Sequence, residues 1–386
     1  MNFDFTEEQQ MMRQMARNFA VKEIKPVVDA DETSHRFQRD LVKKMGELGF
    51  FGCTIPEEYG GSNTGFVAHA LITEEISRIS GSLRASFNMQ AMGTAREIFQ
   101  YGNEKQKKKY IPQLVSAEWL GCICITEPNA GSDVAAMRTK AIKQKDHYLI
   151  NGSKNWITYG EVADIGILYA YTDPQKKHRG ISAFIIDMHS PGITTAAMGE
   201  KMGWNACPTS EVFFEEVKVP EENLLGTEGE GFAYCMGGLD NTRLSAAAGA
   251  VGVAQGLLDE SIKYANEREQ FGNPIGHYQM VQEVIARMVT DIDAARLLTY
   301  RCAYLKDKGV NSTVETSMAK LFSCDVASRV SDLALQILGA YGYSREYAVE
   351  RLLRDAKLYQ LLEGSVNIQK IIIAGDVLGL RPTRKK

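Results

Sequence analysis

The stretch ICITEPNAGSD, residues 123–133, marks the point at which the pattern of the sequence changes from helical to extended. Its first residues are apolar and β-branched, as in a buried strand, and the rest is a loop of small residues with two hydroxyls and several backbone N–H groups. By itself the stretch fits a ligand-binding loop and an ordinary turn about equally. Similar short runs follow at residues 148–150, 165–172, 181–188 and 212–219. The middle third of the chain therefore predicts an antiparallel β-domain.

One dipeptide in this region is a strong turn signal. Asn151 and Gly152 lie between two of the extended runs, and both residues tolerate a positive φ angle. An Asn-Gly pair in such a position is typical of a two-residue β-hairpin. We expect a tight turn there.

Helical patterns precede and follow the extended region. Thr6 with Gln9, and Asn103 with Gln106, have the spacing of helix capping boxes. Apolar residues recur at helical intervals in residues 11–19, 41–48, 68–79 and 91–101, and again from residue 231 to 378. The predicted class is α+β: an N-terminal all-α domain (1–117), a middle β-domain (118–234) and a C-terminal four-helix bundle (235–386).

Composition excludes several classes of protein. The 386 residues carry a net charge of −4, which provides no basic field for nucleic acid. The longest uncharged apolar stretch, residues 244–258, is too short to span a bilayer, and residues 1–8 lack the features of a signal peptide. The seven cysteines form no C-x-x-C pair with metal-ligand spacing. We expect a cytoplasmic protein with reduced thiols, no membrane span and no metal.

The common catalytic signatures are missing from the sequence. No G-x-G-x-x-G follows a strand, and no G-x-S-x-G, P-loop or H-E-x-x-H is present. Glu363, by contrast, stands in the apolar context Leu361-Leu362-Glu363-Gly364-Ser365, where a carboxylate is unusual unless it is paired or used. Burial there should raise its pKa, as a general base requires, whereas the alternative is a surface glutamate at the start of a helix.

Several separated segments can be read together. They are the loop 123–133, Trp156-Ile157-Thr158, REQFG at 268–272, QILGAYG at 336–342 and Glu363-Gly364-Ser365. In order and type they resemble the acyl-CoA dehydrogenase family, and the resemblance covers essentially the whole chain.

This resemblance implies a non-covalently bound FAD. Ile123, Ile125 and Thr126 would meet the pyrimidine edge of the flavin, and Trp156 and Thr158 would flank its reactive ring. The further residues that it implies for FAD are Ser132, Ser365 and Asn367, and, toward the FAD of a neighbouring subunit, Arg268, Gln270, Phe271, Gln336 and Gly339. The enzyme would be a homo-oligomer, most often a tetramer, and would pass its electrons to an electron transfer flavoprotein.

The same resemblance makes Glu363 the base that removes the proton next to a thioester carbonyl. The residues implied for binding the acyl-CoA are Arg84, Asn88, Ser132, Asp240, Arg243 and Gly364. Some family members place their base near the segment that contains Asp240, but Asn241 stands there in this chain, and Asp240 is expected to meet CoA atoms or to cap a helix.

Arg84 bears on which acyl group the enzyme would accept. It is similar in placement to the arginine that holds the distal carboxylate in glutaryl-CoA dehydrogenases, although it could instead pair with Glu74 or Glu75. Members that also decarboxylate carry a tyrosine and a glutamate where this chain has Leu362 and Ser77. We therefore expect oxidation of glutaryl-CoA to glutaconyl-CoA without loss of carbon dioxide. The alternatives are a short-chain or alicyclic acyl-CoA, such as a cyclohexane carboxylate thioester, and a flavin-free CoA-binding scaffold.

Overall fold

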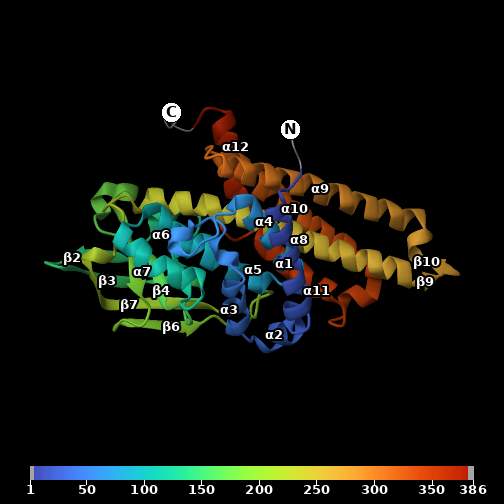
Figure 1. Cartoon of the computed structure of the whole chain (residues 1–386), viewed down its shortest axis with the longest axis horizontal. Coiled ribbons are helices and arrows are strands. Elements are labelled where there is room, and N and C mark those ends of the chain that lie inside the picture. Colours follow the sequence, from blue (N-terminus) through green and yellow to red (C-terminus); the bar gives the residue numbers. More distant parts are fainter. Residues whose placement is uncertain (1–3, 381–386) are drawn as a thin grey trace.

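Two groups of helices, an eight-stranded sheet and a short hairpin of β9 (Glu269–Gln270) and β10 (Asn273–Pro274) make up the described part of the molecule (Figure 1). The computed structural model describes residues 4–380. The first group of helices is α1 (Glu7–Phe19), α2 (Val28–Ser34), α3 (Arg39–Glu47), α4 (Gly65–Ser77), α5 (Gly81–Asn88), α6 (Arg96–Tyr101) and α7 (Glu104–Val115). Both predicted capping boxes are confirmed, at α1 and at α7. The backbone N–H of Gln106 donates to Asn103 at 2.9 Å, so the start of α7 is satisfied locally.

A π-helix, η4 (Met89–Ala95), continues α5 into α6. Because its turns are wider than those of an α-helix, the side chains of α5 and α6 face different neighbours. Short π-helical segments are frequent at functional sites. The amide of Gln90 in η4 donates to the carbonyl of Leu114 in the last turn of α7 and to that of Trp119 after it, and its oxygen accepts from the backbone N–H of Gly121. This π-helix therefore fixes the first helical group to the sheet.

The sheet forms the opposite end of the molecule from the β9–β10 hairpin in Figure 1. Its strands are β1 (Gly121–Cys124), β2 (Lys140–Lys143), β3 (His147–Thr158), β4 (Ile165–Tyr171), β5 (Ile181–Asp187), β6 (Ile193–Ala197), β7 (Thr209–Pro220) and β8 (Leu224–Leu225). They run in the order β6-β7-β3-β2-β4-β5-β8, and β1 pairs with β4. Most ladders are antiparallel, as predicted, but β1 runs parallel to β4 and β2 makes a parallel bridge to it.

The tight turn expected at Asn151-Gly152 was a wrong prediction. Strand β3 continues through both residues, and its register against β7 shifts there, which makes a bulge. Gly152 has a φ of 150°, and a Cβ on it would lie 2.5 Å from the hydroxyl of Thr139. The glycine is therefore required by close approach and a bulge, which share their sequence signature with a turn. The chain reverses earlier, where Gln144 N donates to His147 O.

The second helical group comprises α8 (Gly231–Glu267), α9 (Gln279–Asp307), α10 (Thr313–Leu338), α11 (Ala348–Tyr359) and α12 (Val366–Val377). A short hairpin, β9 (Glu269–Gln270) and β10 (Asn273–Pro274), separates α8 from α9. Since α8 begins at Gly231, the domain boundary expected at 234/235 falls inside this helix.

The glycines of α8 let another helix approach closely. A Cβ on Gly252 or Gly256 would collide with backbone carbonyls of α4 and the residue after it. The small-residue face thus becomes buried packing surface. Within residues 4–380, no helix has the length and apolar character that a membrane crossing would need.

Candidate active site

Glu363 lies in the short segment between α11 and α12. Its backbone has a φ of 54°, and Gly364 follows with a φ of 83°. A left-handed conformation is uncommon for glutamate and persists only where the surroundings hold it. The turn directs the carboxylate back toward α5, and the side chain is 16% exposed. Glu363 is therefore not a surface residue at a helix start.

Two residues of α5 bind one oxygen of this carboxylate. Arg84 Nη1 donates to Glu363 Oε1 at 3.2 Å, and Asn88 Nδ2 donates to the same oxygen at 3.1 Å. The other oxygen, Oε2, is buried and has no partner among residues 4–380. Burial raises the pKa of Glu363, and Arg84 opposes the shift. One carboxylate oxygen thus stays available to accept a proton.

Arg84 is a buried cation, with its side chain 1% exposed. Its guanidinium lies against the rings of Trp204 and Tyr359, at 5.8 and 5.4 Å from their centroids. Gly249 of α8 leaves room for it, because a Cβ there would come within 2.8 Å of Arg84 Nε. Its Nε and Nη2 atoms have no acceptor in the described part of the chain. Buried donors without acceptors are costly, so this site fits an anionic group.

The alternative pairing of Arg84 with Glu74 or Glu75 is not formed. Glu74 binds Arg296 at 3.0 Å, and Glu75 binds Arg13 at 2.8 Å. Both carboxylates therefore face the other side of α4.

Ser77 and Tyr359 form the wall behind Arg84. The Ser77 hydroxyl lies 2.6 Å from the hydroxyl of Tyr359 and donates to the carbonyl of Gly249 at 2.8 Å. Ser77 is thus occupied by neutral partners, and it adds no carboxylate to the surroundings of Arg84.

Asp240 and Arg243 lie one turn apart on α8. Arg243 donates through Nε to the carbonyl of Glu363 at 3.2 Å and through Nη1 to Asp240 at 2.9 Å. Asp240 also accepts from the hydroxyl of Thr313 at 2.6 Å. The expectation that Asp240 caps a helix is wrong, because α8 starts well before it.

The residues expected near the flavin ring come together at the ends of β1 and β3. Asn155 N donates to Thr126 O at 2.8 Å, which places Thr126 beside Trp156. Trp156 has a φ of 59° and is 57% exposed, a strained backbone that holds a large ring at the surface. Ile123 packs on Gly93 of η4, five residues beyond Asn88. This cluster is therefore joined to the Glu363 site through η4.

The remaining residues expected to bind FAD on this subunit differ in exposure. Ser132 is exposed in the loop after β1, and Thr158 and Ile125 are half-buried. Ser365 occupies the N-cap position of α12, directly after Gly364, without a capping hydrogen bond from its side chain, whereas Asn367 is exposed on α12.

The residues expected to reach a second FAD lie at the far end of the helices. Arg268 follows the end of α8, and its guanidinium lies 5.5 Å from the ring of Tyr341. Phe271, at the tip of the β9–β10 hairpin, is 95% exposed, and Gln270, Gln336 and Gly339 are also exposed. From Arg243 to the end of α8 the chain rises about 36 Å at the α-helical pitch. This group is therefore remote from Glu363.

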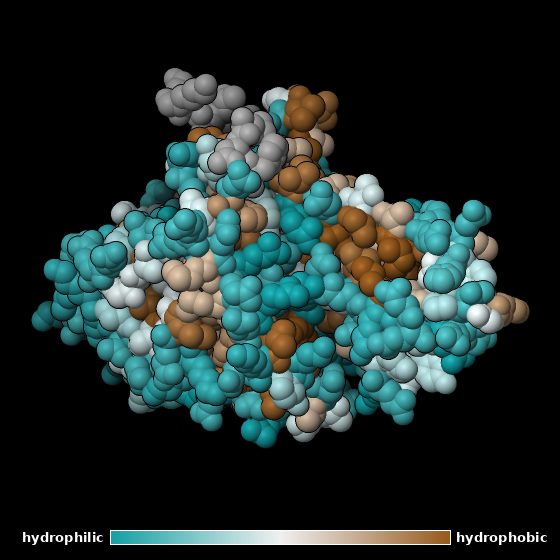
Figure 2. Space-filling model, turned by 45° about the vertical axis from the view of Figure 1, so that its right-hand side comes forward, coloured by the Kyte–Doolittle hydropathy of each residue, from teal (hydrophilic) through white to brown (hydrophobic). Residues whose placement is uncertain are grey.

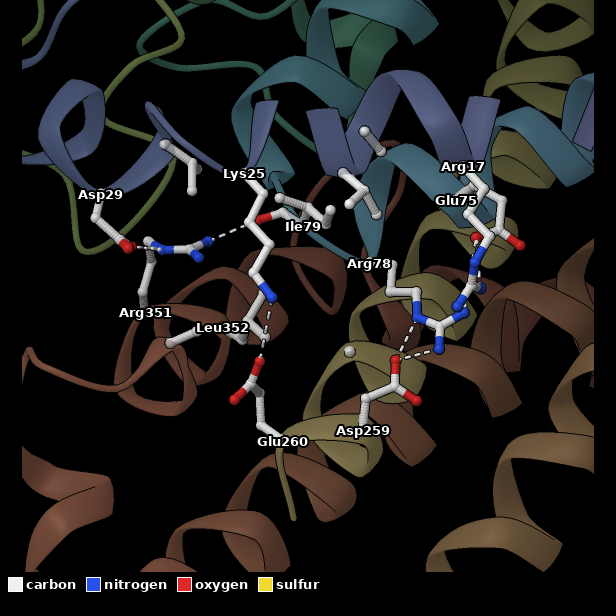
Figure 3. Close-up of a pocket in the computed structure, with 15 residues that line it drawn as sticks. Arg17, Lys25, Asp29, Glu75, Arg78, Ile79, Asp259, Glu260, Arg351 and Leu352 are labelled. Atoms are coloured by element: carbon white, nitrogen blue, oxygen red, sulfur yellow. Dashed lines mark hydrogen bonds and ion pairs between the residues drawn. The ribbon is translucent and has the colours of Figure 1, made fainter. Parts of the chain in front are cut away.

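A separate cavity of about 220 Å³ lies between the N-terminal helices, α8 and α11. Five ion pairs join its lining residues, which Figure 3 draws: Arg17–Glu75, Arg78–Glu75, Lys25–Glu260, Arg78–Asp259 and Arg351–Asp29. Each charged side chain of the lining has a partner of opposite sign, and none of the expected site residues borders it. It reads as a packing defect between ion pairs.

Models of three domains match the chain in sequence order. They are the acyl-CoA dehydrogenase N-terminal domain (residues 6–118), middle domain (122–217) and C-terminal domain (229–378). The chain belongs to the acyl-CoA dehydrogenase family. It is thus an oxidoreductase of a family of FAD flavoproteins, and the expected α+β arrangement is confirmed.

Three similar proteins bear on what this acyl-CoA dehydrogenase does. Glutaryl-CoA dehydrogenase of Desulfococcus multivorans is 50% identical over the full length of both chains. The caffeyl-CoA reductase–Etf complex subunit CarC of Acetobacterium woodii is 40% identical over 97% of this chain and 99% of its own. A solved glutaryl-CoA dehydrogenase–glutaryl-CoA complex superposes with a TM-score of 0.97 at 49% identity, covering 100% of this chain and 99% of the other.

Sequence reasoning missed two buried lysines of this acyl-CoA dehydrogenase. Lys154 on β3 binds Glu127 at 2.8 Å and the carbonyl of Ile125 at 3.0 Å, so it holds the loop after β1. Lys320 on α10 donates to the carbonyls of Leu362 and Gly364. The one available signal for Lys320 was its position in an apolar helical run, Ser317 to Phe322, where a lysine is rarely buried without a role.

Proposed function

We propose that this enzyme oxidises glutaryl-CoA to glutaconyl-CoA, keeps the distal carboxylate, and passes the electrons to an electron transfer flavoprotein. The observation that carries the substrate is Arg84: a buried guanidinium beside the expected base, with two donors that have no acceptor within residues 4–380. A distal carboxylate would supply two acceptor oxygens in a planar, charge-assisted arrangement. The similarity to the Desulfococcus glutaryl-CoA dehydrogenase supports this choice.

The geometry around Glu363 suits removal of the proton from the carbon next to the thioester carbonyl. One oxygen is held by Arg84 and Asn88, so Oε2 is the atom that takes the proton. The raised pKa of the carboxylate, caused by burial, brings its basicity closer to what abstraction of a weakly acidic proton needs. Bound FAD would supply the acceptor for the hydride that leaves the β-carbon.

The chain offers suitable groups for that cofactor. Trp156 presents an exposed aromatic wall next to Thr126, and the end of β1 presents backbone groups to a polar edge. Ile123, Ile125, Thr126, Ser132, Trp156, Thr158, Ser365 and Asn367 would hold FAD on this subunit. Hydrogen bonds from such groups stabilise charge on the ring, and the tryptophan excludes water.

The remote group containing Arg268 supports an oligomer. Arg268, Gln270, Phe271, Gln336 and Gly339 are exposed and lie too far from Glu363 to hold the same FAD. A second subunit would bring them to its neighbour's cofactor, with Arg268 on the pyrophosphate. A homotetramer gives each FAD both sets of residues.

The surroundings of Arg84 support retention of the carboxylate. Leu362 cannot transfer a proton, and Ser77 is held by Tyr359 and Gly249. Departure of carbon dioxide leaves a carbanion that must be protonated, and no proton donor is placed for that step at these two positions.

One experiment tests the base and the substrate together. Anaerobic bleaching of the flavin is followed with glutaryl-CoA, butyryl-CoA and cyclohexane carboxyl-CoA, in the wild type and in the Glu363→Gln, Arg84→Met and Arg84→Lys variants. We expect Glu363→Gln to slow bleaching by all substrates at least about a thousandfold. Arg84→Met should weaken glutaryl-CoA selectively, by about 2–4 kcal/mol, with partial recovery in Arg84→Lys.

The outcomes separate the two parts of the proposal. Equal losses for all three thioesters in Arg84→Met would remove the carboxylate anchor and favour a short-chain or alicyclic substrate. A fully active Glu363→Gln variant would remove the base. Release of labelled carbon dioxide from glutaryl-CoA during turnover would show that the carboxylate is lost.

A further inference from the structure

Three side chains from three helices bind three successive carbonyls around Glu363. Lys320 Nζ of α10 donates to Leu362 O at 3.0 Å and to Gly364 O at 2.8 Å. Arg243 Nε of α8 donates to Glu363 O, and Gln369 Nε2 of α12 donates to Gly364 O at 2.7 Å. Only Lys320 bridges the carbonyls on both sides of the glutamate.

The segment needs such support because its backbone is strained. Glu363 and Gly364 both have positive φ angles, and a left-handed non-glycine residue costs about 1–3 kcal/mol. Three carbonyls that point inward also lack the backbone partners that a helix would give them. Without donors in place, the segment would relax toward an ordinary helix start and turn the Glu363 side chain away from α5.

Lys320 is itself an unusual group. It is fully buried, and no carboxylate lies within ion-pair distance of it in the described structure. The charged and titratable groups that face it are Glu363, Arg84 of α5, Arg243 of α8 and Cys324 of its own helix. Burial lowers the pKa of Lys320, and Arg84 and Arg243 act in the same direction. Burying a cation is costly even when its N–H groups donate to carbonyls. The placement of Lys320 is explained by the backbone segment to which those carbonyls belong, because that segment holds Glu363.

We propose that Lys320 is a positioning residue for the dehydrogenation: by bridging Leu362 O and Gly364 O it holds the left-handed turn that aims Glu363 at the substrate. Its positive charge also favours the carboxylate form of Glu363. The proposal rests on the function proposed above, in which Glu363 is the base. Displacement of a reacting group by about 1 Å can cost about a hundredfold in rate.

A merely structural lysine would behave differently. Loss of a packing role lowers the midpoint of thermal unfolding and the yield, and leaves kcat and its pH profile unchanged in the protein that folds. Loss of the positioning role lowers kcat at nearly constant KM, because CoA binding uses other residues. It also moves the acid limb of the kcat profile to higher pH, since the Glu363 carboxylate loses a neighbouring cation.

The experiment compares Lys320→Met, which has no donor, with Lys320→Gln, which has a donor and no charge. Arg329→Met is the matched control on α10, because Arg329 ties this helix to Asp291 of α9 at 2.9 Å, away from the site. FAD absorbance, thermal unfolding, kcat, KM and the pH profile are measured for each holoenzyme.

We expect kcat to fall about 10- to 100-fold in Lys320→Met with KM changed less than about threefold. Lys320→Gln should recover part of kcat while keeping the shifted acid limb, and Arg329→Met should change stability alone. An unchanged kcat and acid limb in Lys320→Met, with Glu363→Gln inactive, would overturn this proposal and leave the base intact. An active Glu363→Gln variant would overturn both. If Lys320→Met does not retain FAD, Lys320→Gln carries the test, and an unchanged kcat with an unchanged acid limb in that variant would equally contradict the positioning role of Lys320.

Discussion

A single buried carboxyl, Asp355 on α11, should govern part of the pH dependence of stability. Its Oδ1 accepts from the backbone N–H of Trp204 at 3.2 Å, and Oδ2 has no partner within residues 4–380. Burial, with Glu32 nearby, raises the pKa of Asp355 to about 7, and Arg351 opposes this. A folded pKa above the unfolded one gives stability that is fully present below the unfolded value and is lost as pH rises to about 7.

The Asp355→Asn variant removes this titration. Its free energy of unfolding, relative to the wild type, should increase between pH 4 and pH 7 by about 1.4 kcal/mol per pH unit and then level off. Thermal unfolding at closely spaced pH values measures this. Asp332→Asn, on the exposed face of α10, is the control and should run parallel to the wild type. If the stability of Asp355→Asn ran parallel to that of the wild type over this pH range, the pKa of Asp355 would not be raised in the folded protein.

At the scale of elements, the loop after β1 depends on a buried ion pair. Glu127 accepts from Lys154 of β3 and from the backbone N–H groups of Arg138 and Thr139, at 2.5 and 3.0 Å. The pair thus joins both ends of the loop to the strand that carries Trp156. The loop takes its shape from a contact between residues far apart in the sequence.

Replacing Lys154 by methionine should destabilise the protein by about 3–5 kcal/mol, because an unpaired carboxylate stays buried. The double variant Lys154→Met/Glu127→Gln should recover part of that loss and still retain FAD poorly. Lys143→Met on the neighbouring strand, whose ion pair with Glu221 is exposed, should cost at most about 1 kcal/mol. Denaturant unfolding and bound-flavin absorbance report both quantities. A double variant less stable than Lys154→Met would contradict this reading.

The elements that sequence predicts well are those decided by local chemistry. Thr6 and Asn103 start helices because their side chains bond to N–H groups three residues on. Gly152 was misread because glycine serves a bulge and a turn equally, and only the neighbouring Thr139 distinguishes them. Lys320 could not be placed from sequence, because its partners, Leu362 and Gly364, lie more than forty residues away. Pairings at that separation are fixed by helix packing.

For the whole molecule, the exposed apolar surface argues for assembly. Figure 2 shows apolar patches among hydrophilic side chains on one face. The largest exposed hydrophobic side chains include Phe271 of the hairpin, Met280 of α9, and Ile371 and Val377 of α12. Exposed apolar side chains that gather into patches are typical of subunit contacts.

Phe271→Asp should therefore weaken FAD retention and the oligomer together. We expect an apparent Kd for FAD higher by about tenfold or more, equivalent to ~1.4 kcal/mol, and a smaller mass by light scattering. Met11→Asp on α1, also exposed but remote from the hairpin, is the control. A monomer that holds one FAD per chain at wild-type affinity would refute the sharing of sites between subunits.

The π-helix Met89–Ala95 also sets the rotation of α5 about the helix axis relative to the residues that follow it. Each residue of a helix advances the chain by about 100°, so removal of one residue from this segment would turn everything before it by that amount relative to everything after it. Gln90 and its contact with β1 lie close to the site of the deletion, whereas Arg84 and Asn88 would rotate away from the Glu363 carboxylate that they now bind. The number of residues in the π-helix thus sets the alignment of Arg84 with Glu363. Deletion of one residue there should abolish the dehydrogenation and leave the contact between Gln90 and β1 intact.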